Sequence, residues 1–173
     1  MIFSLDQNKD RNRSGWIQGD FGDSMKIEIR AMVPGDYDEI HQLWSATEGL
    51  SLGDDDNRDG IDLYLRRNSG LCFVAMHAGK IVGTALCGHD GRRGILRHLV
   101  VMNEHRGRGL AKLLVRACLD ALAGQGIRKC NIFVMNYNVN GMKFWEHIGF
   151  YHLQDDHRTL QLGTATPFRS GSK

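Results

Sequence analysis

The amino-acid sequence predicts an α/β protein in which a central sheet carries helices on both faces. Two observations favour this fold class. Short apolar stretches of strand length alternate along the chain with stretches whose apolar residues recur at helical spacing. In addition, a glycine-bearing turn at residues 103–111 joins an apolar strand-like stretch to an amphipathic helical one. The chain has 173 residues, 42% of them hydrophobic, which is enough for one core, so we expect one domain.

The first part of the chain predicts one strand and two helices. Apolar and polar residues alternate over 26–32, which is typical of a strand. Asp36 follows, and we expect it to cap a helix that carries Ile40 and Trp44. An acidic loop at 48–56 then leads into a second helix that ends at about residues 68–70.

The middle of the chain predicts three strands and a helix. Residues 71–77 and 81–87 form a hairpin in this interpretation, because the residues 78–80 between them are typical of a turn. A further strand at 95–102 runs into the glycine turn. The helix after the turn has apolar residues at three-and-four spacing and ends near Gly124.

The remaining elements are three strands and one helix. A buried strand is expected at 129–135, and a helix begins at Asn138. Two last strands are expected at 150–153 and 159–162. The order of all these elements places helices on both faces of one sheet.

Composition divides the chain into three parts. Residues 1–24 are polar and lack sustained periodicity, so we expect a loosely ordered arm, or an extension ahead of a native start at Met25. Residues 25–162 form the predicted domain. Residues 163–173 are expected to be a frayed tail.

The glycine turn predicts an anion site. Gly107 and Gly109 lack a Cβ, so the backbone can adopt positive φ and let a ligand approach its amides. The helix that follows presents unpaired N–H groups and the positive end of its dipole. The turn lacks the Lys-Ser/Thr pair of a nucleotide-hydrolase P-loop, and Lys112 stands where a dinucleotide fingerprint has its third glycine. Neither of those two classes is therefore favoured.

Two motifs carry a resemblance to a known family. Arg106, Gly109 and Ala111 match the R-x-x-G-x-A form of a pyrophosphate loop. Residues 138–150 contain an asparagine, a small residue three positions later, an aromatic pair and a Gly-Phe, as in the second signature of the same family. The chain thus resembles the GCN5-related N-acetyltransferases, the GNAT family. The resemblance is strongest over 95–150 and holds in outline across the predicted domain.

The resemblance implies a specific fold. It is a mixed, mostly antiparallel sheet of six to seven strands with helices on both faces. The sheet splays between its fourth and fifth strands, which are residues 96–102 and 129–135 here. Acetyl-CoA would lie in that splay as the cofactor, with coenzyme A as the product.

The resemblance also implies a set of cofactor-binding residues. Val100 and Val101 would offer main-chain groups to the pantetheine arm. Asn138 would anchor the far side of the cofactor, and Trp145 would line the cofactor or acceptor channel, or simply belong to the core. The diphosphate would be held by the amides of Arg106, Gly107, Arg108, Gly109, Leu110 and Ala111.

The implied reaction is direct transfer of an acetyl group from the thioester to a primary amine in a ternary complex. A backbone N–H near Val101 is the expected donor to the oxyanion. In many family members an acidic residue on the central strand accepts the amine's proton, but this chain has Arg97 and His98 there. With a reference pKa of about 6.5, His98 is the candidate base. A structural histidine bonded to a neighbouring strand is the alternative.

The general acid departs from the family pattern as well. The sequence has Phe144-Trp145 where the family often has a tyrosine second, and an indole N–H is no usable proton source at neutral pH. The thiolate either leaves unaided, since a thiol pKa is about 8.5, or receives a proton from another group. Tyr137 is the candidate for that group, and a packing tyrosine is the alternative.

The acceptor that the resemblance implies is an amine carried by a small molecule or a peptide. Family members shape the acceptor site with the loop between the first two helices, which here carries Glu48, Asp54, Asp55 and Asp56. These carboxylates would attract a cationic amine. Alternatively, Asp55, Asp56 or Asn57 caps the second helix and the neighbouring carboxylates complement its dipole.

Composition argues against several other partners. The net charge of +2 and a pI near 8.4 do not indicate nucleic-acid or membrane binding, and no apolar run reaches the ~18 residues of a spanning helix. Four widely spaced cysteines without zinc-site spacing indicate no metal and reduced core thiols, which favours the cytoplasm. Besides the enzyme, a noncatalytic acyl-CoA sensor stays open, because the family's tyrosine and carboxylate are missing. A homodimer also stays open.

Overall fold

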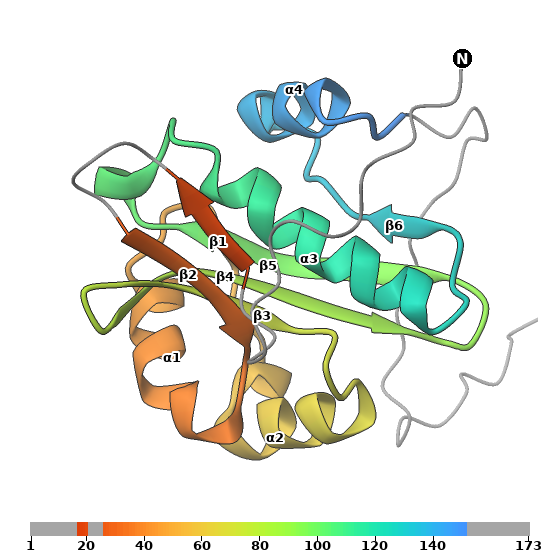
Figure 1. The fold of residues 1–173 in the computed structure, drawn as a ribbon, viewed down its shortest axis with the longest axis horizontal. Coiled ribbons are helices and arrows are strands. Elements are labelled where there is room, and N and C mark those ends of the chain that lie inside the picture. The colour runs from red at the N-terminus through yellow and green to blue at the C-terminus, as the bar shows by residue number, and fades with distance from the viewer. Residues whose placement is uncertain (1–16, 21–25, 152–173) are drawn as a thin grey trace, which may run out of the picture. The chain divides into compact units, whose positions relative to one another are not determined.

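The computed structural model of the chain describes residues 17–20 and 26–151 (Figure 1). These residues fall into two units, one ending at Phe133 and one beginning at Val134. The first unit contains the sheet and the helices α1, α2 and α3, and the second contains the helix α4.

The described strands form one six-stranded sheet in the order β1-β2-β3-β4-β5-β6. Neighbours are antiparallel from β1 to β5, and β5 and β6 are parallel, which confirms the expected α/β class with a mixed sheet. The described part of the predicted domain contributes five strands, β2 to β6, and not the six to seven expected. The strands are β1 (Ile17–Asp20), β2 (Lys26–Ala31), β3 (Phe73–His77), β4 (Lys80–His89), β5 (Gly94–Val101) and β6 (Cys130–Ile132).

The strands differ from expectation at both ends of the chain. β1 comes from the predicted polar arm, where four residues pair in register with β2. β6 ends at Ile132, earlier than the expected strand over 129–135. Phe150 and Tyr151 lie in no strand, and the expected strand at 159–162 lies outside the described residues.

Four helices and three short 3₁₀ turns complete the described structure. Two helices begin at an asparagine cap: the Asn57 Oδ1 atom accepts the Gly60 N–H at 2.9 Å, and the Asn138 Oδ1 atom accepts the Gly141 N–H at 2.8 Å. Of the candidates in the acidic loop, Asn57 is therefore the cap. The helices are α1 (Tyr37–Ser45), α2 (Arg58–Arg67), α3 (Leu110–Gly124) and α4 (Val139–His147), and the turns are η1 (Pro34–Asp36), η2 (Asp54–Asp56) and η3 (Asn103–His105).

Asp36 does not cap α1 through its side chain, contrary to expectation. Its carboxylate accepts two hydrogen bonds from the Arg30 guanidinium, at 2.6 and 2.7 Å, and one from the Val33 N–H at 2.9 Å. Because a paired guanidinium offers a charge-assisted contact, it competes successfully with the capping position for this carboxylate. The first helix is thus tied to the end of β2.

Helices cover both faces of the sheet (Figure 1). Consecutive residues of β4 face opposite sides: a Cβ on Gly83 would lie 3.2 Å from Leu114 of α3, while Thr84 accepts a hydrogen bond from the Trp44 indole of α1. The cluster of buried residues on the α1 side also includes Ile61 and Leu65 of α2. The sheet is therefore enclosed by α3 on one face and by α1 and α2 on the other.

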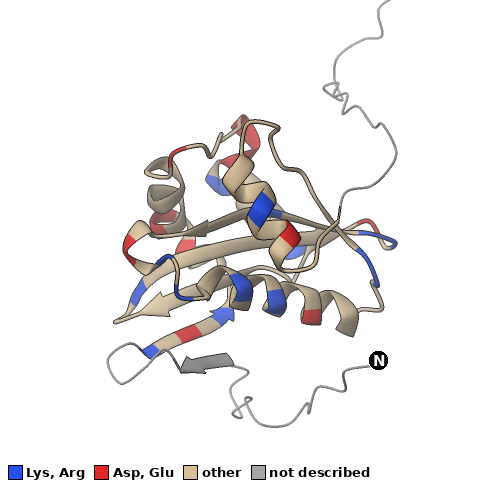
Figure 2. Cartoon of the chain, turned by 90° about the horizontal axis from the view of Figure 1, so that it is seen from above, with Lys and Arg blue, Asp and Glu red and all other residues tan. Residues whose placement is uncertain are grey.

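Charges of both signs are interspersed on the outside of the described elements (Figure 2). On α3, Arg116 and Asp120 form an ion pair at 2.9 Å, one turn apart. None of the helices in the described residues combines the length and the apolar character needed to cross a membrane.

Leu114 and Leu63 offer a matched test of the core. Leu114 of α3 is fully buried, whereas Leu63 of α2 is 63% exposed. Replacing Leu114 with alanine should lower the free energy of unfolding by about 2–5 kcal/mol, because it removes buried methyl groups and leaves a cavity. The Leu63→Ala change should cost about 0.5 kcal/mol or less. Urea titration followed by circular dichroism measures both, and equal losses would contradict the packing described.

Candidate functional site

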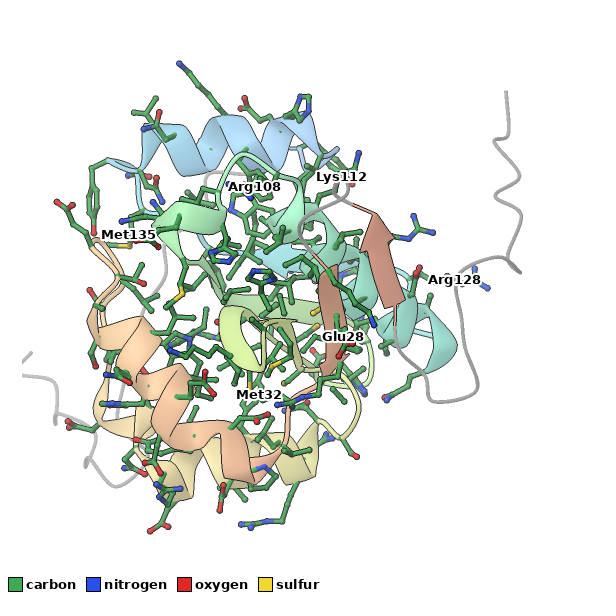
Figure 3. The ribbon with its side chains drawn as sticks, turned by 60° about the vertical axis from the view of Figure 1, so that its left-hand side comes forward. Glu28, Met32, Arg108, Lys112, Arg128 and Met135 are labelled. Atoms are coloured by element: carbon green, nitrogen blue, oxygen red, sulfur yellow. The ribbon has the colours of Figure 1, made fainter. Side chains whose placement is uncertain are left out.

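The turn before α3 has the backbone that its glycines predict. Gly107 and Gly109 both adopt left-handed φ angles, 73° and 82°. Gly109 is the N-cap residue of α3, so no side chain caps this helix, and its first turn carries no acidic residue. α2 and α4 each begin at a capping asparagine, so α3 alone among these three helices presents its first amides uncapped. Figure 3 shows Arg108 and Lys112 at the same end of α3.

Arg106 ties this turn to the end of β5. Its Nε atom donates a hydrogen bond to the Val101 carbonyl at 2.9 Å. The Arg106 N–H donates to the Asn103 carbonyl at 3.2 Å, which closes the η3 turn between the strand and the loop. The position of the α3 amides is thereby fixed relative to the last residue of β5.

Within residues 17–20 and 26–151, the outer edge of β5 has no strand partner over its second half. Its parallel ladder with β6 covers only Gly94 to Leu96, although β5 continues to Val101. The Met102 N–H donates to the Val82 carbonyl of β4 at 2.9 Å. Because main-chain groups alternate in direction along a strand, the N–H and carbonyl of Val101 point away from β4, and those of Val100 point toward it. An open N–H therefore lies beside the loop.

His98 lies at a β-bulge in the middle of β5. In the register of β4 and β5, Thr84 pairs with Val100 and Leu86 with Arg97, so one β4 residue opposes both His98 and Leu99. His98 has a φ of 46°, in the left-handed region that non-glycine residues rarely occupy. Such backbone conformations persist where surrounding contacts enforce them, and they cluster at functional sites.

Contacts from three elements surround the His98 side chain and backbone. The Trp44 ring of α1 lies 4.7 Å from the imidazole, centroid to centroid. The Thr84 hydroxyl donates to the His98 carbonyl at 3.0 Å and accepts the Trp44 Nε1–H at 2.9 Å. The Nε2 atom of His98 lies 3.0 Å from the Asp56 Oδ1 atom, an ion-pair distance at which the N–H is not aligned for a hydrogen bond.

Burial keeps His98 neutral near pH 7. Desolvation lowers the pKa of His98 below its usual value of 6.5, the Asp56 carboxylate opposes this shift, and the Arg97 charge adds to it. A neutral imidazole retains a lone pair, so it is in the state needed to accept a proton.

A pocket of about 880 Å³ adjoins the loop. It lies between the second half of α1, the start of β4 and the chain that follows β5, and Arg106 is part of its lining. Three carboxylates line it, those of Glu39, Glu48 and Glu104. The Glu39 carboxylate accepts the Ile81 N–H at 2.6 Å, so it is partly committed to the start of β4.

The residues of the second motif lie in the second unit. Asn138 caps α4, and the Trp145 ring makes edge contacts with Phe144 and Phe150 at 5.1 and 5.0 Å. Tyr137 is 69% exposed. Within this unit, the Trp145 indole thus belongs to a small aromatic cluster.

The structure brings together residues that sequence reasoning did not connect. In the sequence, Asp56 was a member of the acidic loop and a candidate cap of the second helix, and no spacing linked it to a histidine on a distant strand. The contacts of Trp44 with Thr84 and His98 were missed for the same reason, because each depends on how α1 packs on the sheet. The one available signal was a histidine on the strand that leads into the glycine turn.

Comparison with known proteins supports the resemblance. A model of the acetyltransferase (GNAT) family matches residues 37–150. The acetyltransferase SG1711 of Sodalis glossinidius (strain morsitans) is 33% identical over 137 residues, which cover 79% of this chain and 94% of that protein.

Solved structures share the fold at low sequence identity. The PaiA N-acetyltransferase of Thermoplasma acidophilum, in complex with coenzyme A, has a TM-score of 0.66 at 18% identity, covering 75% of this chain and 92% of that one. The aminoglycoside N-acetyltransferase AAC(6')-Iy, in complex with the bisubstrate analogue CoA-S-monomethyl-acetylneamine, has a TM-score of 0.65 at 21% identity, covering 79% and 99%. A ribosomal-protein-alanine N-acetyltransferase of Brucella melitensis biovar Abortus 2308 has a TM-score of 0.61 at 20% identity, covering 79% and 99%.

The family that the two motifs indicated is thereby confirmed, with the fold found in its solved members. The chain belongs to the acetyltransferase (GNAT) family.

Proposed function

We propose that this protein transfers an acetyl group from acetyl-CoA to a primary amine, by direct attack in a ternary complex. The observation that carries the proposal is the uncapped start of α3, which Arg106 holds against the open edge of β5. The amides at the start of α3 can bind an anion. Beside them, the unpaired edge of β5 can form hydrogen bonds with an extended chain that carries amide groups.

The residues at this end of α3 fit the diphosphate of coenzyme A. The Arg106 N–H is already bonded to the Asn103 carbonyl, so the five amides from Gly107 to Ala111 are the proposed donors. A Cβ on Gly107 would meet nothing within 4 Å, so space for a ligand is present there. Arg108 and Lys112 add positive charge at the same helix end (Figure 3). Acetyl-CoA itself supplies the activated thioester.

Val101 is the proposed oxyanion donor. Its N–H points away from β4 on a strand that β4 holds rigidly, so the dipole needs no reorganisation as negative charge develops on the thioester oxygen. The alternation along β5 directs the main-chain groups of Val100 toward β4. We therefore assign the exposed main-chain contacts with the pantetheine arm to Val101 first.

His98 is the proposed base. A lysine-type amine with a pKa of about 10.4 is almost entirely cationic at neutral pH, so it must lose a proton before it attacks. Desolvation lowers the pKa of His98 and keeps its imidazole neutral, as this role requires. Arg97, its neighbour, has no capacity to accept a proton.

Three residues of the second unit have roles in this proposal. Asn138 would anchor the cofactor's far side, Trp145 would form a wall of the channel, and Tyr137, which is 69% exposed, would return a proton to the departing thiolate. The four cysteines are free thiols, in keeping with the reducing cytoplasm that we propose as the location.

The proposed acceptor is an amine on a small molecule or a peptide. Carboxylates of Glu39, Glu48 and Glu104 line the pocket beside Arg106, and they would attract a cationic amine. Aminoglycoside and ribosomal-protein-alanine N-acetyltransferases are among the proteins with this fold, and both names state an amine acceptor.

A panel of amines tests the proposed reaction. Polyamines, aminoglycosides, small metabolite amines and peptide N-termini are each incubated with the protein and acetyl-CoA, and thiol release is measured. At least one amine should release coenzyme A and gain an acetyl group by mass spectrometry. Binding of acetyl-CoA without acetylation of any amine would contradict the enzyme and leave the sensor interpretation.

Gly109 tests the diphosphate site. A Gly109→Val side chain would project into the space of the diphosphate and force a β-branched residue into a φ of 82°, so coenzyme A binding should be abolished. Gly91→Val is the matched control, since Gly91 has a φ of 92° and open space around it but lies in the turn between β4 and β5. Both changes carry a strain of about 1–3 kcal/mol.

Calorimetry with coenzyme A separates these two variants. The Gly91→Val protein should bind coenzyme A as the wild type does. Wild-type affinity in the Gly109→Val protein would place the diphosphate somewhere else.

A further inference from the structure

Asp56 and His98 come from separate parts of the first unit, and they lie next to each other where both contact α1. Asp56 is the last residue of η2, and His98 is the bulged residue of β5. Their side chains are 15% and 12% exposed, and the Asp56 Oδ1 atom lies 3.0 Å from the His98 Nε2 atom. A carboxylate and an imidazole brought this close inside the protein require an explanation beyond a surface ion pair.

Two hydrogen bonds hold Asp56 in place, one at its carboxylate and one at its main chain. Its Oδ2 atom accepts the Gly53 N–H at 2.8 Å, and the Tyr37 hydroxyl donates to the Asp56 carbonyl at 3.2 Å. One carboxylate oxygen is thus used to hold the turn, and the other faces the imidazole. The acidic loop is therefore ordered so that the Asp56 carboxylate faces His98 of β5.

The two ring nitrogens of His98 have different surroundings. Nε2 is fully buried and faces the carboxylate. Nδ1 is not fully buried, and it forms no hydrogen bond to a described residue. A carboxylate facing one ring nitrogen favours the tautomer with the proton on that nitrogen. The lone pair of His98 then lies on Nδ1, the nitrogen that solvent can reach.

We propose that Asp56 is a positioning residue that keeps the proton of His98 on Nε2 and so makes Nδ1 the base for the amine acceptor. This inference rests on the proposed acetyl transfer. Catalytic hydrogen bonds are often misaligned in ligand-free enzymes and tighten in the reacting complex, as the Nε2 contact would on binding.

The transfer removes two protons from the ammonium group. Nδ1 takes the first, and the freed lone pair of the amine forms the new C–N bond to the thioester carbon. The second leaves the nitrogen of the tetrahedral adduct as the C–S bond breaks, and the departing thiolate gains one proton, directly or through Tyr137, so that the amide and coenzyme A are both neutral at the reacting atoms. The imidazolium carries both ring protons and faces the Asp56 carboxylate, which stabilises it. The proton on Nδ1 then leaves to water, so the protein returns to its starting state.

The charges around His98 determine the sign of the pH effect. Asp56 of η2 raises the pKa of His98 and Arg97 of β5 lowers it, while Trp44 of α1 and Thr84 of β4 contribute no charge. Desolvation outweighs the carboxylate, so the transfer rate should rise with pH through a midpoint below 6.5. Removing the Asp56 charge should move that midpoint to still lower pH and leave a weaker, less well-oriented base.

The test compares the Asp56→Asn variant with an Asp59→Asn control. The carboxamide introduced by Asp56→Asn retains an oxygen for the Gly53 N–H, so the turn is preserved, and Asp59 is an exposed aspartate of the first turn of α2. Imidazole NMR titrations of the acetyl-CoA complexes give the tautomer and midpoint of His98. Single-turnover acetyl transfer to the best amine of the panel gives the rate from about pH 5 to about pH 9, a range that spans the ordinary histidine pKa.

The inference expects three results together. Wild type and Asp59→Asn show the Nε2–H tautomer and the same midpoint. Asp56→Asn lowers the midpoint, mixes the tautomers, and reduces the transfer rate by about 10-fold to 100-fold. His98→Gln removes the acidic limb of the rate profile.

Other outcomes overturn it. A lower rate in Asp56→Asn without a change in midpoint or tautomer would assign Asp56 a purely structural role. An Nδ1–H tautomer in the wild type would contradict the proposed base directly. If no amine is acetylated, the proposed function fails along with the catalytic role, and the titrations then report the pairing alone.

Discussion

The unpaired outer edge of β5 is the constraint on which the site depends. Because the ladder to β6 ends at Leu96, the second half of the strand is paired on one side only, by β4, in the part of the chain that the structure describes. That half contains the bulge at His98, the Val101 N–H and the anchor point of the glycine turn. A strand paired on both edges would have no main-chain group left for a substrate.

The bulge has a strained backbone, which surrounding contacts maintain. A left-handed φ at a non-glycine residue costs about 1–3 kcal/mol, which the rest of the structure must offset. Here the Thr84 hydroxyl holds the His98 carbonyl, and Thr84 is itself held by the fully buried Trp44. The strained backbone of His98 therefore lies beside fully buried side chains, whose contacts offset its cost. The same backbone conformation sets the direction of the imidazole.

Much of the fold could be predicted from the sequence, because α3 and the glycine turn depend on local rules of spacing and φ. The role of Asp36 could not be predicted correctly from the sequence. Its carboxylate was expected to cap α1, but it pairs with the Arg30 guanidinium instead. β1 was missed because a short strand at a sheet edge needs only a partner, and composition does not reveal one. The contact between Asp56 and His98 depends on tertiary packing, which the periodicity of a sequence does not report.

The backbone at position 98 also restricts which side chains evolution can place there. Glycine, asparagine, aspartate and histidine adopt a φ of 46° most readily, whereas β-branched and bulky residues rarely do. Of the four tolerated types, only histidine has an ordinary pKa close to neutrality. The conformation of this one residue thus limits the side chains that can supply a base at this point of β5 to histidine and aspartate, and of these only histidine titrates near neutral pH as an ordinary side chain.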